Sequence, residues 1–130
     1  MPAISIEILP EGSIATDVAT NYAGQTLNGN VLDALANGAS SASLSFTNLS
    51  GATNAKVIVL LQAFDPVAAS PIVSITNGSS QYDLPVSGAN SAKRLEWNNI
   101  PVSFLTSFAV VNSTGTTFPA AGNVIHVMPI

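Results

Sequence analysis

The chain has 130 residues, of which 47% are hydrophobic, and it carries only three basic and seven acidic residues and no cysteine. A soluble domain is usually charged at about a quarter of its positions, so this chain must cover itself with uncharged polar groups or with neighbours. The net charge of −4 argues against a nucleic-acid partner, and the lack of cysteine excludes disulfides and zinc–thiolate sites.

The chain opens without the basic and apolar regions of a signal peptide. Its longest strongly apolar run, Val57–Leu61, is far shorter than the ~20 residues that span a bilayer. We therefore expect neither classical secretion nor insertion into a membrane. The length favours one domain over residues 1–130.

Apolar residues recur with a period of two, which is typical of strands with one buried face. The first such strand is predicted at Ile4, Ile6 and Ile8, which alternate with Ser5 and Glu7. Residues 10–30 then lack a period and are rich in small polar groups. We expect them to form an arm or long loop that contacts a neighbouring subunit or a larger assembly.

One short helix is predicted over Val31–Ala36, between Asn30 as its N-cap and Asn37-Gly38 as its stop. Leu44 and Phe46 then alternate with polar residues, as in a strand. Val57–Phe64 is continuously apolar, as expected of a central strand covered on both faces. The remaining predicted strands are Ile72–Thr76, Tyr82–Val86, Arg94–Trp97, Val102–Val111 and Val124–Met128.

About eight short antiparallel strands with turn-forming spacers predict an all-β fold, a β-sandwich or jelly roll. Two of the spacers share the pattern Asn-x-[Ser/Thr]-Gly-x-Thr, beginning at Asn48 and Asn112. These two and Asn77 also begin glycosylation sequons. Without a secretion signal we interpret them as turns.

No residue pattern predicts catalysis, a cofactor or a metal site. His126 is the only histidine, and no Gly-x-Ser-x-Gly elbow accompanies it, so a packed or interface role is favoured. The seven carboxylates are scattered along the sequence. A carboxylate pair assembled only in space remains the open alternative.

The segment Lys93–Trp97 holds the densest charge and the only tryptophan. Alternation places Leu95 and Trp97 on one strand face and Arg94 and Glu96 on the other. Trp and Arg are enriched at interface hot spots, although Trp97 also suits a core position. The candidate interface residues are Arg94, Trp97, His126, Met128 and Ile130.

Two C-terminal stretches, residues 108–115 and 122–127, resemble the endings of small virion proteins of tailed bacteriophages. Residues 44–51 show a similar pattern of a strand followed by a turn. The matched strand-and-turn patterns cover about a fifth of the chain. Together with the low charge, they resemble capsid decoration (cement) proteins.

That resemblance implies a structural protein rather than an enzyme. It would be made in the host cytoplasm, bind the outer capsid surface as a homo-oligomer, with a trimer preferred, and bridge neighbouring capsomers of the major capsid protein. The alternative is a receptor- or glycan-binding module of a phage spike, head fibre or tail. A small glycan hydrolase is the third and least favoured interpretation. No cofactor, nucleic acid or membrane is expected as a partner.

Overall fold

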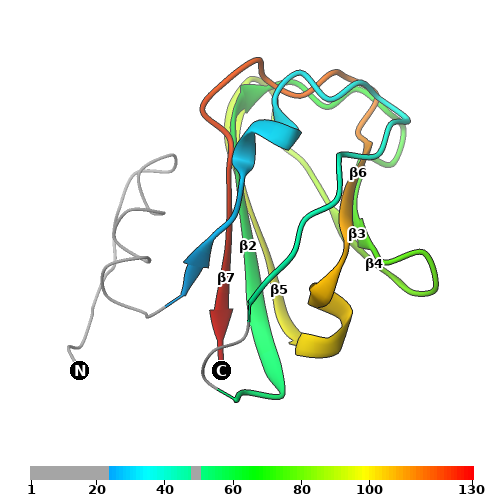
Figure 1. Cartoon of the computed structure of the whole chain (residues 1–130). Helices are drawn as coiled ribbons and strands as arrows, with labels where there is room; N and C mark the ends of the chain where they lie inside the picture. The colour runs from blue at the N-terminus through cyan, green and yellow to red at the C-terminus, as the bar shows by residue number, and fades with distance from the viewer. Residues whose placement is uncertain (1–23, 48–50) are drawn as a thin grey trace.

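Two antiparallel sheets pack face to face in the computed structural model, which describes residues 24–47 and 51–130 (Figure 1). The predicted all-β, sandwich-like fold is therefore confirmed. The four-stranded sheet has the order β1–β7–β2–β5, and the three-stranded sheet has the order β4–β3–β6. The strands are β1 (Gln25–Thr26), β2 (Asn54–Phe64), β3 (Ile72–Thr76), β4 (Gln81–Pro85), β5 (Ser91–Pro101), β6 (Ala109–Ser113) and β7 (Val124–Pro129).

β2 lies at the centre of the larger sheet, between β7 and β5. Val57, Val59 and Leu61 belong to the core between the sheets. Ile58 and Leu60 alternate with them, so they lie on the opposite face of the sheet, and they are buried too. The prediction of a central strand covered on both faces is confirmed.

The core between the two sheets is formed by aliphatic strand residues and closed by aromatic rings. Val73 and Ile75 of β3 and Val110 of β6 are fully buried in it. The rings of Phe64 and Phe118 meet edge to face with centroids 5.8 Å apart. Such ring pairs add stability beyond the apolar area that they bury.

Residues 38–46 run beside β6 and extend the smaller sheet. Leu44 and Phe108 exchange backbone hydrogen bonds of 2.7 and 3.0 Å, and the amide of Ser41 donates to the carbonyl of Val110. The pairing takes the form of isolated bridges rather than a continuous strand. The alternation around Leu44 correctly predicted an extended segment with Leu44 and Phe46 buried.

The predicted helix over Val31–Ala36 is wrong. The chain instead forms a single 3₁₀ turn, η1 (Gly29–Leu32), capped by the side chain of Asn28, which accepts from the amide of Asn30. Ala34 follows with φ of 55°, a left-handed conformation that a right-handed helix cannot contain. Its amide donates to the carbonyl of Pro119 instead of continuing a helix.

Two further predictions need correction. Val102–Val111 is not one strand, because Val102–Thr106 form a 3₁₀ helix, η2, and β6 begins only at Ala109. Residues 24–30 of the predicted arm include β1 and the start of η1, and Leu27 is buried in the core. The rest of that arm and the strand predicted at residues 4–8 lie outside the described residues.

Candidate interaction surface

The face of the four-stranded sheet that points away from the core brings together several of the predicted interface residues. Strand alternation separates this face from the core, where Ile125 and Val127 of β7 lie. We call it the outer face, and its residues are Lys56, Ile58, Leu60, Arg94, Glu96, Val124, His126 and Met128.

The strand register arranges the outer face in rows. Ile58 of β2 is paired with Glu96 on one side and with His126 on the other. Leu60 is paired with Arg94 and Val124 in the same way. Apolar side chains therefore occupy the centre of the face, and charged groups lie along its β5 side.

Three charged side chains form a small ion-pair network on the β5 side of the outer face. The Glu96 carboxylate accepts from the Arg94 guanidinium at 2.5 Å and lies 3.5 Å from the Lys56 ammonium. All three side chains are about one-third exposed. Solvent screens ion pairs that are this exposed, so they contribute little to stability. Their main effect is to keep the β5 border of the outer face polar.

His126 lies at the other border, beneath the start of the described chain. Its Nδ1 is 2.8 Å from the hydroxyl of Thr26 in β1. The backbone of Gly24 lies so close to the ring that a Cβ there would be 2.0 Å from Nε2. Burial lowers the pKa of His126 from 6.5 to about 4, so the imidazole is neutral at physiological pH.

Among the described residues, the hydrogen bonds of the outer face join the imidazole of His126 to a hydroxyl and not to a carboxylate. No group of three or more His, Cys, Asp or Glu side chains in this part of the chain is placed to hold a metal ion. The apolar centre of this face, Ile58 and Leu60, is only 2% and 1% exposed, so a partner would reach mainly the borders of the face.

The structure divides the five predicted interface residues. Arg94, His126 and Met128 share the outer face, and Ile130, which is 59% exposed, lies just beyond β7. Trp97 instead lies in the core with 4% exposure, and its indole nitrogen donates to the carbonyl of Tyr82 at 3.2 Å. Alternation correctly predicted Leu95 and Trp97 on one face of β5 and Arg94 and Glu96 on the other.

Sequence reasoning missed Ile58, Leu60 and Lys56 as members of this surface. The available signal was the unbroken apolar run of β2, whose alternate residues must face away from the core. Sequence reasoning also missed Gly24 and Thr26, which contact His126 from the region predicted to be an arm or long loop.

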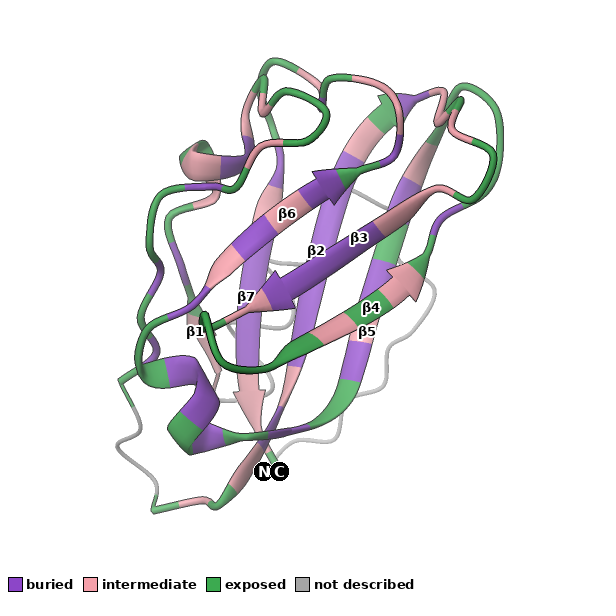
Figure 2. Cartoon of the chain, turned by 90° about the vertical axis from the view of Figure 1, so that its right-hand side faces the viewer, coloured by how far each residue is buried: buried purple, intermediate pink, exposed green. Residues whose placement is uncertain are grey.

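A second candidate surface is the sandwich side formed by β4 and β5, the end strands of the two sheets (Figure 2). Within the described residues no strand pairs with the outer edge of either one. β5 is eleven residues long. Unpaired edges of this length offer backbone donors and acceptors to another chain.

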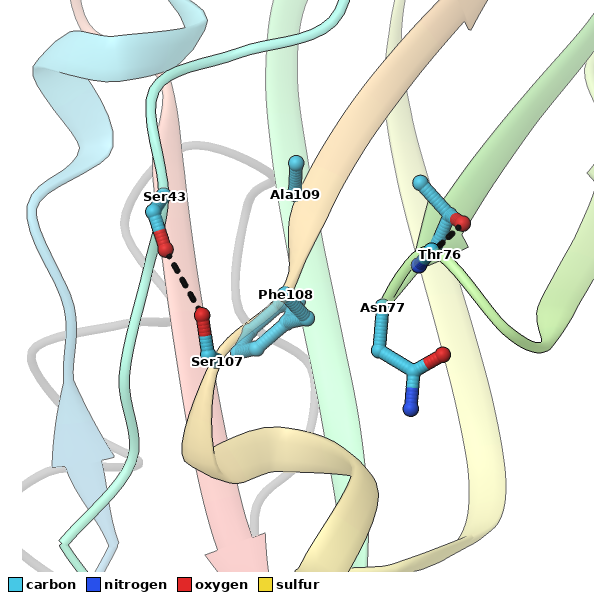
Figure 3. Close-up of a pocket in the computed structure, with 7 residues that line it drawn as sticks. Ser43, Thr76, Asn77, Ser107, Phe108 and Ala109 are labelled. Atoms are coloured by element: carbon cyan, nitrogen blue, oxygen red, sulfur yellow. Dashed lines mark hydrogen bonds between the residues drawn. The ribbon is translucent and has the colours of Figure 1, made fainter.

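A shallow pocket of about 210 Å³ lies at one end of the smaller sheet (Figure 3). Ser43 and Ser107 point toward each other across its rim, with their hydroxyl oxygens 3.0 Å apart. Phe108 is buried, so its ring offers no open face for a ligand. The lining contains no ionisable side chain, and it consists of Ser43, Thr76, Asn77, Gly78, Ser107, Phe108 and Ala109.

Comparison of the chain with protein-family models, curated proteins and solved structures gave no match. Across residues 24–47 and 51–130, no helix has the length and apolar character needed to cross a membrane.

Proposed function

We propose that this protein is a structural component of a phage virion, a decoration protein that binds the outer capsid surface and bridges neighbouring capsomers. Its partners would be further copies of itself, with a trimer preferred, and the major capsid protein. It would act by binding alone, without cofactor or catalytic step.

The observation that carries the proposal is the sandwich side formed by β4 and β5. Among residues 24–47 and 51–130 no strand pairs with the outer edge of β4 or β5, and Arg94, Asn98 and Asn99 are exposed along β5. Strand edges can bind a neighbouring subunit through backbone hydrogen bonds, without using charged side chains. The few charges of the chain agree with such contacts.

The glycan-binding alternative is less well supported. Sugar-binding surfaces commonly use exposed aromatic rings as platforms, yet no aromatic side chain among the described residues is exposed. The pocket beside Phe108 is polar at its rim but buries that ring. It therefore offers hydrogen bonds without a stacking surface.

Quantitative mass spectrometry of purified virions tests the proposal. Hundreds of copies per particle would support decoration of the shell, whereas tens or fewer would favour a spike, fibre or tail. Absence from the particle would refute the virion interpretation. Light scattering should show an oligomer, and a stable monomer at micromolar concentration would contradict the expected trimer.

The salt dependence of capsid binding tests the mechanism. With so few charges to screen, binding should persist when sodium chloride is raised from low to near-molar concentration. Capsids that lack the protein should be less stable to heat, and adding the protein in high salt should restore them. Complete release by salt would show that electrostatic attraction dominates.

A further inference from the structure

The centre of the outer face is apolar, and it is already buried within a single chain. The central residues Ile58 and Leu60 are only 2% and 1% exposed, and His126 at the β7 border is 1% exposed. None of the described helices and strands is layered over this face (Figure 1). A sheet face becomes buried by packing against another element, so the outer face requires a cover that belongs to the same chain.

The N-terminal sequence has the pattern of such a cover. Ile4, Ile6 and Ile8 alternate with Ser5 and Glu7, which predicts a strand with one strongly apolar face. Residues 1–23 lie outside the described part of the structure. An isolated strand with three isoleucines on one face needs a surface to bury them.

The distribution of charge also favours the N-terminal segment as the cover of the outer face. Residues 1–23 contain three acidic residues, Glu7, Glu11 and Asp17, and no Lys or Arg. Two of the three basic residues of the chain, Lys56 and Arg94, border the outer face, opposed there by the single carboxylate of Glu96. The third basic residue, Lys93, is buried on the core side of β5.

The position of Gly24, where the N-terminal segment joins the described structure, also favours this segment as the cover. Gly24, the first described residue, lies directly against the ring of His126 on the outer face. A segment tethered beside its binding surface has an effective concentration in the millimolar range. It therefore competes well against a second copy of the protein for the same surface.

We propose that the N-terminal segment Ile4–Ile8 packs its isoleucines over the outer face and forms a third layer of the sandwich. Its immediate contacts are Ile58, Leu60 and His126. The Nε2 atom of His126 has no hydrogen-bond partner among the described residues, and a segment lying over the ring brings polar groups within its reach. This inference does not depend on the proposed function.

The single histidine of the chain permits a direct test. Diethyl pyrocarbonate modifies a neutral imidazole that solvent can reach, and mass spectrometry measures the rate at His126 in the full-length protein. The triple variant Ile4→Thr, Ile6→Thr and Ile8→Thr should raise this rate by about tenfold or more, because the cover opens. The control pair Ser5→Thr and Glu7→Thr, on the opposite face of the segment, should change it by less than about twofold.

Three outcomes would overturn the proposal. The first is rapid modification of His126 in the wild-type protein. The second is an equal rate in the isoleucine and control variants. The third is protection that ignores the isoleucines but disappears on dilution, which would show that a second copy covers the face.

A milder variant guards against loss of the fold. Near-ultraviolet circular dichroism of the buried Trp97 reports whether the triple variant keeps its core. If it does not, Ile6→Thr alone should still raise the rate by about threefold. A synthetic peptide of residues 1–12, added to the triple variant, should restore protection, and its failure to do so would count against the proposal.

Discussion

The ammonium of Lys93 lies 4.9 Å from the centroid of the Phe64 ring and donates a 3.0 Å hydrogen bond to the carbonyl of the same residue. It also donates to the carbonyl and hydroxyl of Ser91. Lys93 lies on the core side of β5, opposite Leu61 of β2. A charge buried in this way needs such partners in place of water.

Replacing this buried ammonium should destabilise the fold. Lys93→Met keeps the length of the side chain but removes the donors to the carbonyls of Phe64 and Ser91, at a cost of about 1–3 kcal/mol. Lys56→Met is the matched control and should cost less than about 1 kcal/mol, because Lys56 is partly exposed and paired only at 3.5 Å. Urea unfolding measures both changes, and equal losses would contradict the role given to Lys93.

The stability of the protein should fall on mild acidification because of His126. Burial lowers its pKa from 6.5 to about 4. As the pH falls between these values, the unfolded chain takes up a proton that the folded chain does not bind, so the free energy of unfolding decreases. The loss is complete below pH 4 and amounts to about 3 kcal/mol.

Two variants separate this effect from other titrations. His126→Gln, which stays neutral, should flatten the dependence between pH 6.5 and 4. The pKa of Asp83 is lowered by hydrogen bonds from Ser74 and Gln81, so its contribution is lost as the pH falls through the ordinary carboxyl range and below it. Asp83→Asn should therefore leave the slope above about pH 5 unchanged. Thermal unfolding across this range measures both, and an unchanged slope in His126→Gln would refute the assignment.

The sequence predicted the strands best where local pattern and tertiary environment agree. β3 has the predicted bounds, and β7 extends only one residue beyond them. In both strands alternate residues lie in the core and on the opposite face, which is the information that a period of two contains. β2 was recognised by its unbroken apolar run, because a central strand needs apolar residues on both faces.

Features that depend on distant partners could not be predicted from local sequence. β1 is two residues long and exists because Gln25 and Thr26 pair with β7, about a hundred positions away. The 3₁₀ helix after β5 begins at Val102, whose amide bonds to the carbonyl of Thr53, a residue that precedes β2. The outer face is likewise assembled from three strands by register alone, so its membership follows only from the pairing.

Asn112 is predicted to be the most sensitive polar residue of the fold. It is fully buried, and its amide nitrogen donates 2.8 Å hydrogen bonds to the carbonyls of Leu35 and Thr116. Its amide oxygen accepts from the amide and the hydroxyl of Thr114. The sequon that begins here was interpreted as a turn, but Asn112 and Ser113 are the last residues of β6 and only Thr114 lies beyond the strand. A glycan on this nitrogen would displace the bonds that hold it.

Asn112→Asp should destabilise the protein by about 3 kcal/mol or more, because an oxygen would then face two carbonyl oxygens in a buried site. Asn99→Asp, on the exposed side of β5, is the control and should stay within about 0.5 kcal/mol. Chemical denaturation at neutral pH measures both variants. If Asn112→Asp lowers the free energy of unfolding as little as Asn99→Asp does, the hydrogen bonds around Asn112 tolerate the substitution and the prediction is wrong.

Gly115 and Gly78 offer a matched pair for separating backbone strain from steric clash. Both have positive φ, 88° and 91°, so any side chain there is strained. A Cβ on Gly115 would lie 2.5 Å from the backbone nitrogen of Ala68, whereas a Cβ on Gly78 would meet nothing within 4 Å.

Gly78→Ala should cost about 1 kcal/mol from the left-handed conformation alone. Gly115→Ala should cost about 2–4 kcal/mol, because the clash is with backbone that is itself bonded to Thr114. Unfolding free energies of the two variants give the comparison directly, and equal values would mean that the segment around Ala68 moves away at no cost.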